Sequence, residues 1–151
     1  MYHYTDSGLK NIRLVNGYKV KKTPYGEAVA IEDLEGLHKE IGKWLVKAPK
    51  ALTGAEFRFL RHELDMSQKK LGQILGKSEQ AVGRWERSFD KPVEPTADRF
   101  MRVIYSEYAG GSGTVKALIE QLCELDKLEH SECRLEERNG RWRIAGEARA
   151  A

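Results

Sequence analysis

Apolar residues recur at helical spacing through the middle of the chain, starting just after Asp33. Asp33 is a residue that favours helix N-caps, and the apolar residues that follow it return every three or four positions as far as Leu45. This pattern predicts an amphipathic helix over 34–47. Pro49 ends it, because the residue before a proline disfavours helical geometry.

Beyond residue 52 the pattern changes to shorter helices, each with its own start signal. Thr53 and Glu56 form a T-x-x-E capping box, which predicts a helix running to about residue 65. Ser67 caps a second helix that Gly76 ends, and Ser78 caps a third.

One further helix follows the prolines at 92 and 95. Thr96 is the residue expected to open it, with Phe100, Val103, Ile104 and Tyr108 as its apolar positions. Together these helices predict a compact bundle.

Both ends of the chain carry turn signals instead. Asn16-Gly17 predicts a first hairpin, Thr23-Pro24-Tyr25-Gly26 a second turn, and 28–31 a strand, so we expect a small antiparallel sheet. Near the other end, 110–113 is a glycine-rich joint, 114–128 has a helical pattern, and Asn139-Gly140 predicts a hairpin. In that hairpin Glu136 lies opposite Arg143, and the apolar face holds the residues Cys133, Leu135, Trp142 and Ile144.

These elements predict an α+β fold that is mainly α. We divide it into a small β-plus-helix unit at 1–50, which is a candidate for binding a partner, a bundle of the five-helix type at 51–109, and a helix with a β-hairpin at 114–147. The last unit is the expected dimer contact, because its apolar faces need a cover.

Composition narrows the class of protein. Hydrophobic residues are 40% and charged residues 32% of the 151, which is ordinary for a globular protein. No apolar run approaches the roughly 20 residues of a membrane span, and the first residues lack a signal-peptide pattern, so we expect a cytoplasmic protein without a membrane partner. The net charge is +3, and the positive excess lies entirely in the first 88 residues, because these carry +5 and the rest of the chain carries −2. Cys123 and Cys133 are interpreted as reduced thiols, which form a bridge only if their Cα atoms lie within about 7 Å.

The stretch 68–87 has the pattern of two helices packed across a tight turn. Gly72 stands where the backbones would approach and Gly76 at the turn, while Leu71, Leu75, Val82 and Trp85 point inward. On the second helix, helical spacing then leaves a polar set on exposed or partly exposed faces: Glu79, Gln80, Gly83, Arg84 and Arg87. Gln and Arg side chains can each make two hydrogen bonds with a base edge in the DNA major groove.

Here the chain resembles the Xre/Cro-type helix-turn-helix regulators, through Ser67-Gln68-x-x-Leu71-Gly72-x-x-Leu75-Gly76-x-Ser78-x-x-x-Val82-x-x-Trp85-Glu86. It departs at Lys77, where the family usually has an apolar residue. Within that family it looks closest to the DNA-binding half of MqsA-type antitoxins, especially at Leu52-Thr53-Gly54-x-Glu56, Arg61 and Arg84-Trp85-Glu86.

The resemblance implies a role for individual residues. Gln80 and Arg84, with Glu79 beside them, would read bases. The residues that would touch phosphates or flanking bases are Gln68, Lys69, Lys77, Ser78 and Arg87.

The N-terminal segment departs from those antitoxins, which carry a zinc ribbon there that grips the toxin. Residues 1–52 hold no cysteine, and His3 and His38 with Asp6 and Asp33 lack ligand spacing, so we expect no metal and no cofactor. Lys19, Lys21 and Lys22 are interpreted as a solvated strand face, with a phosphate-contacting patch as the alternative. The C-terminal arginines are interleaved with acidic residues and are interpreted as an ion-paired hairpin, with a second nucleic-acid site as the alternative; they are Arg134, Arg138, Arg141 and Arg143.

The sequence therefore predicts a non-enzymatic, sequence-specific double-stranded DNA-binding repressor that regulates its own gene. It would bind a palindromic operator as a homodimer. The alternative is an antitoxin that neutralises a protein toxin through its N-terminal unit and autoregulates its operon. We find no nucleophile with a base, phosphate-binding glycine loop or metal cluster that would indicate an enzyme.

Overall fold

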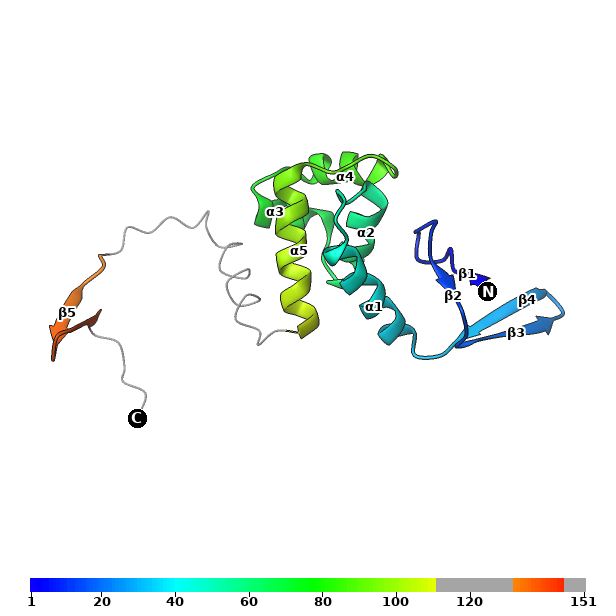
Figure 1. The fold of residues 1–151 in the computed structure, drawn as a ribbon. Coiled ribbons are helices and arrows are strands. Elements are labelled where there is room, and N and C mark those ends of the chain that lie inside the picture. The colour runs from blue at the N-terminus through cyan, green and yellow to red at the C-terminus, as the bar shows by residue number, and fades with distance from the viewer. Residues whose placement is uncertain (111–131, 146–151) are drawn as a thin grey trace.

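The structure is a computed structural model, and it describes residues 1–110 and 132–145. Helices are the predominant secondary structure of these residues (Figure 1). The helices in these ranges are α1 Leu34–Lys47, α2 Gly54–Glu63, α3 Gln68–Leu75, α4 Glu79–Arg87 and α5 Pro95–Gly110. With the short antiparallel strands described below, they confirm the predicted α+β, mainly α fold class.

The predicted helix starts are confirmed for the first four helices. Asp33 accepts a hydrogen bond from the Gly36 amide at 3.1 Å, and the Thr53–Glu56 capping box is complete. Ser67 and Ser78 each accept from the amide three residues on, both at 3.0 Å. Each cap supplies a partner to an amide that the helix itself cannot satisfy.

The predicted start of α5 at Thr96 is wrong. The carboxylate of Glu94 accepts hydrogen bonds from the amides of Thr96 at 3.0 Å and Ala97 at 2.9 Å, and these bonds hold the pKa of Glu94 below its ordinary value. Pro95 then occupies the first helical position, where its missing N–H costs nothing.

The predicted inner face of α5 is partly wrong as well. Val103 is 60% exposed and Tyr108 is 56% exposed, although Ile104 is buried as expected. The helix turns the side carrying Met101 and Tyr105 toward the core and α1, and this orientation depends on a partner that the helix sequence does not reveal.

The N-terminal strands form two separate pairs rather than one sheet. β1 Tyr2–His3 pairs with β2 Arg13–Leu14, and β3 Tyr18–Thr23 pairs with β4 Gly26–Ile31, both antiparallel. The predicted turn at 23–26 is confirmed, whereas the predicted hairpin about Asn16-Gly17 is wrong. Asn16-Gly17 connects β2 to β3, but β2 pairs back with β1, so the strands on either side of this turn have different partners.

The C-terminal hairpin consists of β5 Leu135–Arg138 and β6 Arg141–Ile144 around the predicted Asn139-Gly140 turn. Glu136 lies opposite Arg143 and forms an ion pair with it, as predicted. The predicted helix at 114–128, most of the glycine-rich joint and Cys123 lie outside the described residues.

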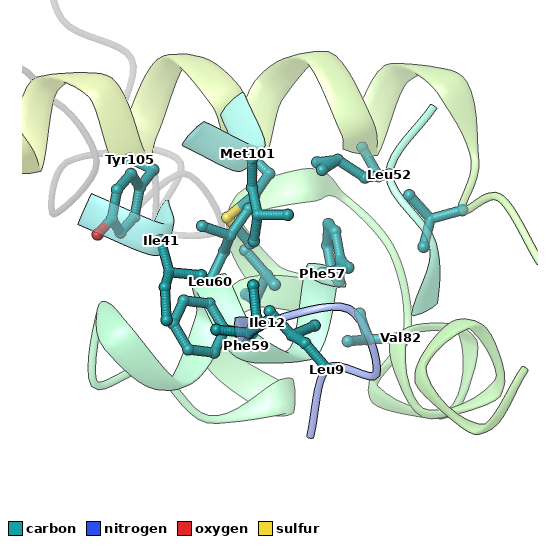
Figure 2. Close-up of a cluster of buried hydrophobic side chains, with 14 of the residues drawn as sticks. Leu9, Ile12, Ile41, Leu52, Phe57, Phe59, Leu60, Val82, Met101 and Tyr105 are labelled. Carbon is teal, nitrogen blue, oxygen red and sulfur yellow. The ribbon is translucent and has the colours of Figure 1, made fainter. Parts of the chain in front are cut away.

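One buried cluster unites the N-terminal segment with the helices (Figure 2). Leu9 and Ile12, from the loop between β1 and β2, belong to the same cluster as Phe59 of α2 and Val82 of α4. Helix α1 joins it through Ile41 and Leu45. The first fourteen residues therefore pack into the same core as the helices. None of the described helices is long and apolar enough to cross a membrane.

Candidate nucleic-acid interface

Helices α3 and α4 are joined by a turn of three residues, 76–78, and two glycines make the turn possible. Gly76 ends α3 with φ of 68°, the left-handed conformation that glycine adopts without cost. A Cβ at Gly72 would lie 2.7 Å from the carbonyl oxygen of Lys77, which is closer than any side chain tolerates. The predicted close approach at Gly72 is thus confirmed, and Lys77 donates its amide to the Gly72 carbonyl at 2.8 Å.

The inner face of α4 anchors the helix to the bundle. Ala81 and Val82 are buried, and Trp85 meets the ring of Phe57 edge-on, with the centroids 5.9 Å apart. This supports the interpretation of Trp85 as a packing residue.

The outer face of α4 presents long polar side chains. Glu79, Gln80, Arg84 and Arg87 are all exposed, as helical spacing predicted. Gly83, which we placed on this face, is instead buried: a Cβ there would lie 3.1 Å from Arg87 Nη1 and 3.5 Å from Gln68 Oε1. The side chains of two neighbouring residues therefore cover it.

A buried ion pair fixes how α4 lies against α2. Arg61 donates two hydrogen bonds to Glu86, from Nε at 2.8 Å and from Nη2 at 2.7 Å, and both side chains are almost fully buried. Arg61 Nη1 also donates to the Met66 carbonyl, and Gln68 Nε2 donates to Glu86 Oε1 at 3.2 Å. Helices α2, α3 and α4 are thus linked by one hydrogen-bonded network centred on Glu86.

Sequence reasoning missed this network. Arg61 and Glu86 are 25 positions apart in the sequence. From the sequence, both were identified only as part of the motif that resembles the helix-turn-helix regulators. Their separation in the sequence gave no sign of the contact. A charged residue on the same helix as two inward-facing apolar residues was the available signal, since a buried charge needs a partner.

The remaining predicted contact residues lie around the same surface. Lys69 is exposed at the start of α3, and Lys77 is exposed in the middle of the turn. The hydroxyl of Ser78 is used to cap α4, and Gln68 is half-buried with its amide group directed at Glu86. Among the described residues, Lys69, Arg84 and Arg87 form no ion pair, so their charges face solvent.

His62, near the end of α2, is a titratable group beside the network centred on Glu86. Within 1–110 and 132–145, no group of three or more His, Cys, Asp or Glu side chains is placed to hold a metal ion. His62 lies beside Arg58 and Arg61, and its partial burial together with these two positive charges lowers its pKa. The neutral imidazole accepts hydrogen bonds from the arginines.

Comparison of the chain with protein-family models, with curated proteins and with solved structures gave no match.

Proposed function

We propose that this protein is a sequence-specific, double-stranded DNA-binding transcriptional repressor that acts on an operator near its own gene. It binds as a homodimer to a palindromic site, in the cytoplasm, and carries out no chemical reaction. In this proposal the outer face of α4 enters the major groove.

The observation that carries the proposal is the outer face of α4. Four long polar side chains project from a nine-residue helix whose other side is locked to α2 and α3 by the Glu86 network. A protein that reads bases needs its reading side chains on an element that cannot shift, because base contacts depend on angles and distances.

The chemistry of this face suits base edges. Arg84 can donate two hydrogen bonds to guanine O6 and N7, and Gln80 can bind adenine N6 and N7 in the same two-point manner. Glu79 can accept from cytosine N4. Gln80 and Arg84 are four positions apart and lie on the same side of the helix, so they face the groove together.

The surroundings of α4 suit the phosphate backbone. The first amides of α3 and α4 have no partner within their own helices, and the partial positive charge at a helix N-terminus attracts phosphate. Lys69 is the second residue of α3, and Lys77 lies in the turn just before the Ser78 cap of α4. Contacts of this kind hold the protein on DNA of any sequence and make the affinity depend on salt.

The proposal is tested with Arg84→Ala in a shift assay on a selected duplex and on a scrambled duplex of the same composition. Loss of two base hydrogen bonds should weaken specific binding by about 1–3 kcal/mol and leave nonspecific binding nearly unchanged. Arg13→Ala is the matched control, because Arg13 is an exposed arginine on β2, outside α3 and α4. Unchanged discrimination between the duplexes in Arg84→Ala would remove α4 from the reading role.

Lys69→Ala separates phosphate contacts from base contacts. It should weaken binding to both duplexes alike and reduce the slope of log affinity against log salt by about 1. A changed sequence preference would instead assign Lys69 to base reading.

A further inference from the structure

The β3–β4 hairpin extends from the body, at the end of the molecule away from α4 (Figure 1). Every residue of β3 after Tyr18 is exposed, and so are most residues of β4. Its register places Tyr18, Val20, Val29 and Ile31 on one face, and Val20 is 51% exposed. A two-stranded hairpin is only marginally stable in water unless a further strand or a helix packs against it. Most of this hairpin is exposed, so a further strand would stabilise it.

The outer edge of β4 has backbone groups available for a further strand. The amide of Glu32 bonds to the carbonyl of Gly17, and bonded pairs alternate along an antiparallel ladder. Ala28 and Ala30 therefore direct their backbone groups at β3. The amides and carbonyls of Glu27, Val29 and Ile31 point away from the hairpin, and no strand among the described residues pairs with this edge.

We propose that a second copy of this chain occupies this edge, β4 against β4 in antiparallel orientation about a twofold axis at Val29. The two hairpins then form a four-stranded sheet in which Val29 lies opposite Val29 of the second copy, and Glu27 lies opposite Ile31 of the second copy. This pairing does not depend on whether the protein binds DNA.

Charge selects β4 over β3 as the paired edge. β3 carries Lys19, Lys21 and Lys22, and in a β3–β3 pairing about Val20 Lys19 would lie opposite Lys21 of the second copy. Like charges directly opposite are destabilising, and lysines on an edge strand discourage pairing there. β4 carries no lysine or arginine, and its inner positions are alanine, so its edge brings no like charges together.

The ends of the two hairpins also fit this arrangement. Tyr25 at the tip is 99% exposed, and Leu34, the first residue of α1, is 46% exposed. Pairing about Val29 places Tyr25 opposite residue 33 of the second copy, beside its Leu34. Apolar groups at the two ends therefore find complements.

Sedimentation of the full chain over a range of concentrations tests the proposal. Strand pairing over six residues buries less area than the roughly 1,200 Å² of a stable interface, so we expect a concentration-dependent monomer–dimer equilibrium. Val29→Pro removes one outward amide from each chain without removing a bond within the hairpin, and should weaken dimerisation roughly tenfold or more. Val20→Pro is the matched control, since Val20 is the cross-strand partner of Val29 on the same face, and it should leave the equilibrium unchanged.

Tyr25→Ser provides a second variant that the folded monomer tolerates, because Tyr25 touches almost nothing in a single chain. It should also shift the equilibrium toward monomer. A chain that stays monomeric at all concentrations, or a dimer that both variants leave unchanged, would overturn the proposal, the second result placing the dimer contact elsewhere. DNA binding measured on the same samples shows separately whether the proposed function holds.

Discussion

Replacing Glu86 by alanine removes the centre of the network that orients α4. Glu86 accepts two hydrogen bonds from Arg61 and one from Gln68, and the carboxylate is almost completely buried. Without it, the buried guanidinium of Arg61 keeps only the Met66 carbonyl and the weak contact with His62 as partners. An unpaired buried charge is costly, because the protein interior solvates it far less well than water does.

The expected cost follows from measurements on broken buried ion pairs. Removing one partner of such a pair destabilises a protein by about 3–5 kcal/mol, out of a total stability of roughly 5–15 kcal/mol. We therefore expect Glu86→Ala to lower the free energy of unfolding in urea by about 3–5 kcal/mol, with the m-value unchanged. Glu79→Ala is the control on the same helix, and should change stability by less than about 0.5 kcal/mol because Glu79 is exposed.

A double variant shows whether the loss of stability comes from the unpaired charge of Arg61 or from the missing Glu86 side chain itself. If the cost arises from the unpaired charge, Arg61→Met combined with Glu86→Leu should recover most of the stability, because apolar replacements of buried ion pairs are often neutral. A cost below about 1 kcal/mol for Glu86→Ala would refute the reasoning, since it would mean that the Arg61 charge is not confined to the interior.

Two other variants test the packing of α1 against α5 and the start of α5. Gly42→Ala would place its Cβ 2.1 Å from the ring of Tyr105, so we expect a loss of about 1–3 kcal/mol in urea unfolding, whereas Gly110→Ala, with nothing within 4 Å, should be neutral or slightly stabilising. Glu94 has a pKa held below 4.5 by two amide hydrogen bonds, so its contribution is present above pH 4.5 and is lost as the pH falls below it. Unfolding measured across this range should show a weaker acid dependence in Glu94→Gln, and an identical dependence would contradict the capping role.

The sequence predicted the helices well because helix starts and ends depend on residues that are close together in the chain. The bounds of α1 and the caps at Thr53, Ser67 and Ser78 each depend on residues within one helical turn. The predicted start of α5 was wrong because the carboxylate of Glu94 reaches forward to the amides of Thr96 and Ala97, which places the first helical residue at Pro95.

The sequence was a poorer guide to contacts between residues far apart in the chain, such as strand pairs and buried ion pairs. Asn16-Gly17 has the sequence of a hairpin turn, yet β2 pairs with β1, and only the whole chain determines which strand is nearest. The same limit explains the exposed Val103 and the unforeseen Arg61–Glu86 pair. The outward positions of Gln80 and Arg84 were predicted, because they follow from two buried positions on one helix.

Selection of bound sequences from a pool of random duplex DNA, using the full chain, tests the central claim most directly. We predict an enriched motif with dyad symmetry, whose half-sites lie about one helical turn apart, and loss of specific base positions when the selection is repeated with Arg84→Ala. No enrichment over the starting pool at low salt would contradict the account.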